Sequence, residues 1–207
     1  TSNSSLSFMG INNLTSNTAI IGGALSFTES YLYTHCSSST FLSIVYFTSN
    51  TAERGSAIYM DSVILINNKD NVLCNMFFDH NYARVGGTIY WIYDNSSTRK
   101  HGMKVRPMIM NTQFTNNIAY YGNQIATQAM QFVGPSSYEA TVYNQALKPP
   151  LYFKMIDFYN NNVYGEININ PLIKKSDDST QCNKLNPYVS VTNQEDLVSS
   201  TGVFTFD

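Results

Sequence analysis

The residues best suited to acid–base chemistry lie in one short stretch of the chain. Asp79, His80 and Arg84 fall within six residues, and Asp61 lies 18 residues upstream. Enzymes that cleave polysaccharides by general acid–base catalysis need clustered carboxylates, often with a cationic side chain beside them. Acids are sparse in this chain, so we expect Asp79 to form a turn and expect no catalytic residue. A carbohydrate-active enzyme, either a polysaccharide lyase or a glycosidase, remains the alternative function.

Metal and cofactor motifs are also weak. His35, His80 and His101 are far apart in sequence, and the cysteines lack the Cys-x-x-Cys spacing of zinc sites. The chain has no phosphate-binding loop, no dinucleotide-binding Gly-x-Gly-x-x-Gly element before a helix, and no Ser or Cys nucleophile elbow. We therefore expect no bound metal and no cofactor.

Composition restricts the partners that this chain can bind. Only 13% of the 207 residues are charged, against roughly a quarter in average proteins, whereas Asn, Ser and Thr together supply 65 residues. A net charge of −2 argues against nucleic acid, because neutralising phosphates requires a basic surface. No apolar run approaches the roughly 20 residues of a transmembrane helix. The 43% of hydrophobic residues suffice for a core.

A repeated motif organises the chain and is centred on an Asn. The motif has an apolar residue three positions before the Asn, Ala two after it, Gly five after it and an aliphatic residue eight after it. The copy around Asn161 is one residue short and ends at Gly165. The intervals between successive Asn residues are 33, 31, 36 and 44. The five centres are Asn17, Asn50, Asn81, Asn117 and Asn161, and the glycines are Gly22, Gly55, Gly86, Gly122 and Gly165.

The local pattern of each copy predicts strands. Segments such as 41–47 and 88–93 are short, β-branched and aromatic, and they are bounded by Asn and Gly. Helical repeats are excluded because Leu/Ala-rich segments are missing. We therefore predict an all-β fold, a right-handed single-stranded parallel β-helix of about five coils, in which equivalent residues stack about 4.8 Å apart. Few charges are expected on its sides, since like charges on neighbouring coils would repel.

In this architecture the Asn and Gly residues form structural ladders at the turns. Asn tolerates left-handed conformations, and its amide can bond to the turn or to the Asn of the next coil. Gly permits a positive φ or a close backbone approach.

The motif resembles the repeats of a known group of surface proteins. Its FxxN element, as in Phe47–Asn50, and its GGA(I/L) element, as in Gly22–Leu25, are similar to those of the polymorphic outer membrane proteins and related pectin-lyase-like proteins. The resemblance covers about residues 8–167. It implies a large, exported surface protein used for adhesion or extracellular structure.

The domain organisation follows from where the motif stops. We expect β-helix repeats over residues 1–170, and an irregular further coil or cap over 171–207. The sequence begins with Thr in mid-repeat, and its first residues do not show a charged start followed by an apolar signal core, so we expect a processed protein or a fragment of a longer one.

Covalent modifications fit an extracellular location. Glycosylation acceptor patterns occur at Asn3, Asn13 and Asn95, of which Asn95 lies in a predicted exposed loop. The three cysteines leave at least one thiol free or bonded outside this stretch, and the pairing stays open. The cysteines are Cys36, Cys74 and Cys182.

Tyrosines near the inward positions should form outward aromatic rows, which either stiffen the repeats or bind glycans or a partner chain. They are Tyr31, Tyr33, Tyr59, Tyr90, Tyr93, Tyr120 and Tyr121. We predict an extracellular structural or adhesive module that acts through other protein chains, further domains of the same protein or glycans. Passive carbohydrate binding is a further alternative.

Overall fold

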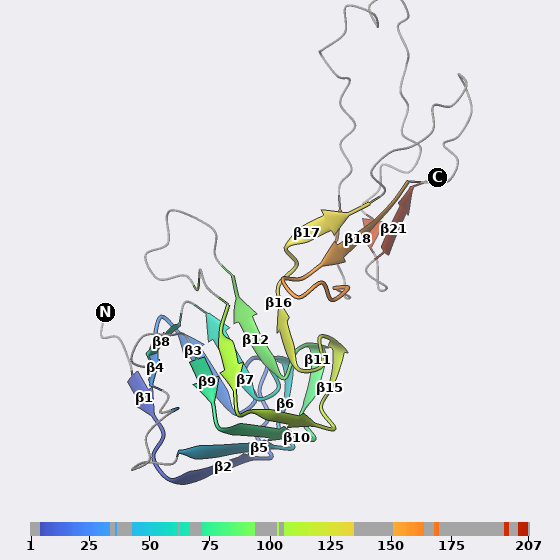
Figure 1. The fold of residues 1–207 in the computed structure, drawn as a ribbon. Coiled ribbons are helices and arrows are strands. Elements are labelled where there is room, and N and C mark those ends of the chain that lie inside the picture. Colours follow the sequence, from blue (N-terminus) through green and yellow to red (C-terminus); the bar gives the residue numbers. More distant parts are fainter. Residues whose placement is uncertain are drawn as a thin grey trace, which may run out of the picture. The chain divides into compact units, whose positions relative to one another are not determined.

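The computed structural model divides the chain into two compact units. Unit 1 comprises Thr1–Gln131 and Ile156–Val163, and unit 2 comprises Phe132–Met155 and Tyr164–Asp207. All regular elements among the described residues are β-strands (Figure 1). The described residues are 5–33, 36, 43–61, 63–66, 72–93, 103, 106–134, 151–163, 168–169, 197–198 and 203–206.

Unit 1 contains five sheets, and the strand pairs whose register is known run parallel. The sheet with the order β14-β10-β5-β2 consists of Gln113–Thr115, Met76–Asp79, Ile44–Thr48 and Ile11–Thr15. The order β15-β11-β6 joins Ile118–Tyr121, Tyr82–Gly86 and Thr51–Arg54. The order β16-β12-β7-β3 joins Ile125–Thr127, Ile89–Ile92, Ile58–Asp61 and Leu25–Thr28.

Two smaller sheets complete unit 1. The order β1-β4-β8 joins Ser5–Ser7, Tyr31–Tyr33 and Ile64–Ile66, and β13 (Met108–Met110) pairs with β9 (Val72–Cys74). Isolated parallel bridges from Thr18 to Thr51 and from Ile21 to Arg54 place residues 18–21 beside β6. An all-β fold with parallel sheets is thereby confirmed.

The strands of each sheet come from successive copies of the motif, and the motif stays in register. Phe78 pairs with Phe47 on one side and with Phe114 on the other. Ile89 is likewise paired with Ile58 and Ile125. Equal spacing within each copy keeps this register, because a slip of one residue would turn every inward side chain outward.

The core of unit 1 consists of rows of like side chains. The ring centroids of Phe47 and Phe78 are 4.8 Å apart, as are those of Phe78 and Phe114, and the rings are nearly parallel. Ile58 and Ile89 are fully buried beside this row. Stacking of equal rings adds roughly 0.5–1.5 kcal/mol per pair to the free energy of burial.

The remaining two sheets contain antiparallel pairs. The order β17-β18-β21 joins Gln131–Val133, Leu151–Ile156 and Val203–Phe206, with β18 and β21 antiparallel. Strands β19 (Asn168–Ile169) and β20 (Leu197–Val198) also pair antiparallel. Of residues 171–207, the structure describes only those in β20 and β21.

Candidate functional site

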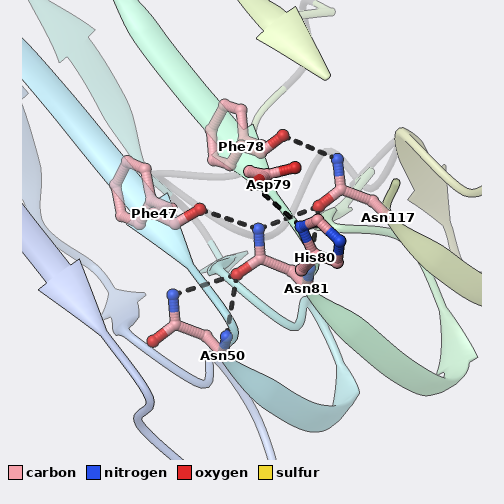
Figure 2. Close-up of polar contacts among 7 residues, drawn as sticks. All are labelled: Phe47, Asn50, Phe78, Asp79, His80, Asn81 and Asn117. Carbon is pink, nitrogen blue, oxygen red and sulfur yellow. Dashed lines mark hydrogen bonds and ion pairs between the residues drawn. The ribbon is translucent and has the colours of Figure 1, made fainter. Parts of the chain in front are cut away.

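The most highly connected polar feature of unit 1 is the asparagine row, which consists of Asn17, Asn50, Asn81 and Asn117. Asn50 and Asn81 are 0% and 1% exposed. Figure 2 shows the inner part of the row, with the amides of Asn50, Asn81 and Asn117 joined by hydrogen bonds across neighbouring strands.

Every link of the row has the same pattern. The backbone N–H and the Nδ2 of Asn50 both donate to Oδ1 of Asn81, each at 3.0 Å. Asn17 makes the same two bonds to Oδ1 of Asn50, and Asn81 makes them to Oδ1 of Asn117. The row is therefore directional, with donors facing the next copy and acceptors facing the previous one.

A second set of bonds ties the amides of Asn50, Asn81 and Asn117 to the backbone of the preceding copy. Nδ2 of Asn81 also donates to the carbonyl of Phe47 at 2.9 Å, and Nδ2 of Asn117 donates to that of Phe78 at 2.9 Å. Asn81 thus makes four side-chain bonds, which fully satisfy a buried amide. A buried polar group with complete partners specifies register without a desolvation penalty.

The residue before each row Asn creates the bend that turns the amide inward. Ser16, Ser49, His80 and Asn116 have φ between 53 and 55 degrees, in the left-handed region, whereas the motif asparagines lie outside it. Their small or polar side chains tolerate this conformation better than bulky residues do. The left-handed position therefore lies one residue before the position that the sequence suggests.

Asn161 lies outside the row. Its Nδ2 donates to Oδ2 of Asp157 at 3.0 Å, and its backbone N–H donates to Oδ1 of Asp157 at 2.9 Å. The Asp157 carboxylate is 2% exposed and also accepts the N–H of Tyr159 and of Thr127. The sequence did not single out Asp157, although Asp often accepts the backbone N–H two residues later in a turn, as Asp157 does from Tyr159.

The turn glycines follow the motif in three copies and shift by one residue in the third. Gly22, Gly55 and Gly122 have positive φ, but in the third copy this conformation belongs to Gly87. A β-bulge between Ala83 and Gly86 inserts one residue there. Gly86 instead lies against the ring of Tyr121, where a Cβ would come within 2.7 Å.

The candidate acid–base residues do not converge on one site in the described part of the chain. Asp79 Oδ2 is 2.8 Å from His80 Nδ1, and both side chains are partly exposed. Arg84 pairs with Glu53 at 2.6 Å instead. The neighbours of Asp79 in register are Thr48 and Thr115. The other carboxylate oxygen of Asp79, Oδ1, is buried and has no hydrogen-bond partner among the described residues.

Among the described residues, no group of three or more His, Cys, Asp or Glu side chains is arranged to hold a metal ion. The same residues contain no helix with the length and apolar character needed to cross a bilayer.

The tyrosines divide into stacked, buried and exposed sets. Tyr59 and Tyr90 stack at 5.9 Å, while Tyr46 stacks on Phe77 at 5.0 Å. Stacked rings turn their faces to one another, which leaves mainly ring edges for a ligand. Burial raises the pKa of Tyr90 and, far more strongly, that of Tyr121, whose hydroxyl donates to the carbonyl of Thr127.

Three other predicted tyrosines are more accessible. Tyr33 and Tyr120 are exposed at 38% and 57%, and Tyr31 is partly buried. Tyr93 packs against Trp91 and Phe158 in an aromatic cluster. That cluster also includes Tyr159, which accepts a hydrogen bond from Nε1 of Trp91 at 3.1 Å.

The cysteines and glycosylation candidates are only partly described. Cys36 and Cys74 form a disulfide across 38 residues. Asn13 is exposed on β2. Four predicted site residues lie outside the described residues, namely Asn3, Asn95, Gly165 and Cys182.

Comparison of the chain with protein-family models, with curated protein sequences and with solved structures finds no match.

Proposed function

We propose that unit 1 is a right-handed parallel β-helix in which each copy of the motif is one coil, and that it serves as an extracellular structural or adhesive module. The asparagine row carries this proposal. Three successive links with identical donors and acceptors are what a stack of equivalent coils requires, because each coil repeats the contacts of the last.

The row also supports a mechanical role over a chemical one. The inner amides of Asn50 and Asn81 each make four bonds within the protein. The stacked Phe47, Phe78 and Phe114 rings pack in the core beside the row. Such an interior resists local opening, since breaking one link leaves buried polar groups without partners. We propose that unit 1 serves as a stiff scaffold that contacts other protein chains or glycans. The surface proteins with similar FxxN and GGA(I/L) repeats support this role by resemblance.

The disulfide between Cys36 and Cys74 supports an extracellular location. Disulfides persist in oxidising compartments and are rare in the cytosol. The bond joins Cys36, which follows β4 in the chain, to Cys74 in β9.

Two experiments test the proposal. Antibodies against the purified protein should label intact, unpermeabilised cells of its natural source, and labelling only after permeabilisation contradicts the surface location. Purified protein should also leave a panel of polysaccharides uncleaved. Cleavage that Asp79→Asn abolishes and that Glu29→Gln, at an exposed site after β3, leaves intact overturns the structural role in favour of a glycan-processing enzyme.

A further inference from the structure

One edge of unit 1 is formed by β1, β2, residues 18–21 and β3. We call the sides of these segments that face away from the second copy of the motif the first-repeat edge. Each of β1, β2 and β3 is the terminal strand of its sheet. Figure 1 shows β1 and β2 at the border of the unit. Main-chain groups along such an edge are a ready template for another strand.

The opposite side of unit 1 is partly covered by a turn. Residues 157–161 lie over β16, where Thr127 donates its N–H to Asp157 at 3.2 Å and accepts from the N–H of Phe158 at 3.0 Å. Nδ2 of Asn161 lies 3.0 Å from where a Cβ on Gly122 would be. The turn therefore takes the position that a further copy of the motif would need over β16, whereas β14 and β15 remain terminal strands of their sheets.

The strands of the first-repeat edge are short, but the edge lacks the charges and Pro that commonly protect an edge. Residues 5–33 contain one charged residue, Glu29, and no Pro. Proteins commonly discourage strand addition with edge Lys, Pro or inward charges. Here Met9, Ile11 and Ile20 are instead 72%, 70% and 74% exposed. These side chains favour contact with an apolar partner.

Asn17 specifies what kind of partner fits. Its Nδ2 donates once, to Asn50, and no donor is bonded to its Oδ1 among the described residues. In the inner links that Oδ1 position accepts two bonds from the Asn of the preceding copy, and the second Nδ2 hydrogen goes to a carbonyl three residues before that Asn. Asn17 therefore offers one unfilled acceptor and one unused donor in the inner-link arrangement.

We infer that the first-repeat edge binds a parallel β-repeat that carries an FxxN element. The partner's Asn donates its backbone N–H and its amide to Oδ1 of Asn17, and the carbonyl of its aromatic residue accepts from Nδ2 of Asn17. Its aromatic side chain covers Leu14, as Phe78 covers Phe47. This inference rests on the proposed β-helix and names the partner of that scaffold.

A second copy of this chain is a poorer occupant. The side of unit 1 that would supply the donors is the side of Asn117, and there the turn at 157–161 occupies the position above Gly122 and β16. An edge-to-edge pair of two first repeats would bring one Asn17 acceptor against another. A separate FxxN repeat meets neither obstacle.

The chain supplies its own probe for this edge. A fluorescein-labelled peptide of residues 45–61 contains Phe47, Asn50 and Ile58 without any cysteine. We expect saturable 1:1 binding to the full 207-residue protein by fluorescence anisotropy. The Asn50→Asp peptide has a carboxylate in place of the donating amide and should bind at least about 10-fold more weakly, the effect of losing about one good hydrogen bond.

Matched protein variants locate the binding surface. Ile11→Lys and Ile20→Lys, at exposed sites of the first-repeat edge, should each weaken peptide binding about 10-fold or more, since Lys protects an edge. Ile118→Lys, at a 60% exposed site of the fourth copy, should leave binding within about two-fold. Hydrogen exchange should slow at the amides of β2 when the peptide is bound.

Three results overturn the inference. They are the absence of peptide binding, equal binding of the Asn50→Asp peptide, and binding that Ile118→Lys weakens as much as Ile11→Lys. Self-association in ultracentrifugation that Ile11→Lys removes, without peptide binding, identifies a second copy as the occupant instead. Urea unfolding of Asn81→Ala tests the proposed scaffold separately. If that variant is destabilised as expected but the peptide does not bind, the docking inference alone is refuted.

Discussion

Replacing Asn81 with Ala is the sharpest perturbation of the asparagine row. The side chain accepts two bonds from Asn50 and donates one each to Phe47 and Asn117. Its removal leaves the backbone N–H of Asn50, one Nδ2 hydrogen of Asn50 and the carbonyl of Phe47 without these partners, in residues that are fully buried. Water cannot replace the lost bonds without opening the core.

The magnitude follows from the number of groups left unpaired. Each buried donor or acceptor without a partner costs about 1–3 kcal/mol, so three such groups should lower the free energy of unfolding by about 3 kcal/mol or more. Asn17→Ala is the matched control, because Asn17 is exposed and its side-chain amide makes a single hydrogen bond among the described residues, of 2.9 Å, to Asn50. That variant should cost about 1 kcal/mol or less.

Urea unfolding followed by circular dichroism measures both variants, with the disulfide left intact. The expected order of destabilisation is Asn81 first, Asn117 second and Asn17 last, because Asn117 is partly buried and receives the two bonds from Asn81. If Asn81→Ala costs no more than Asn17→Ala, the row does not stabilise the scaffold. An unfolded Asn81→Ala protein leaves the comparison of Asn117 with Asn17 as the test.

Three further predictions concern other parts of unit 1. Reduction of the Cys36–Cys74 disulfide should lower the free energy of unfolding by up to about 4 kcal/mol, the loop-entropy value for 38 residues, and comparison of urea midpoints with and without reductant checks it. The free energy of unfolding should fall as the pH rises above 10, because burial raises the pKa of Tyr121 and Tyr90 and the unfolded chain then loses protons that the folded chain keeps. Each of these tyrosines contributes up to about 1.4 kcal/mol per pH unit. Urea unfolding at a series of pH values measures the slope, which Tyr121→Phe should make shallower. In thermal unfolding, Gly55→Ala should lower the stability by well above the roughly 1 kcal/mol expected for Gly10→Ala. Both glycines have positive φ, but only a Cβ at position 55 would meet the carbonyl of Ile58. Equal losses of stability contradict the proposed turn.

The strands and their parallel arrangement were predictable because the motif repeats with constant internal spacing. Phe47, Phe78 and Phe114 stand at the same position of successive copies, and like residues in repeated units become neighbours in a sheet. The mutual bonding of the asparagines was one of two options that the sequence left open. Constant spacing cannot distinguish an amide that bonds within its own turn from one that bonds across strands.

Features that depend on loops of variable length escaped the sequence reasoning. Asp157 meets Thr127 across 30 residues, and Trp91 bonds to Tyr159 across 68, distances at which no local pattern predicts contact. The Cys36–Cys74 pair was one of several pairings that three cysteines allow. The shift of positive φ to Gly87 arises because the two adjacent glycines are equally able to adopt it, and the bulge selects the second.

A crystal structure of the 207-residue protein tests the central claim most directly. We predict a right-handed parallel β-helix in which Asn17, Asn50, Asn81 and Asn117 lie in one line, each amide oxygen of the last three accepting two bonds from the Asn before it. Sheets that close in any other way, or asparagines that point to solvent without contacting one another, would contradict the account.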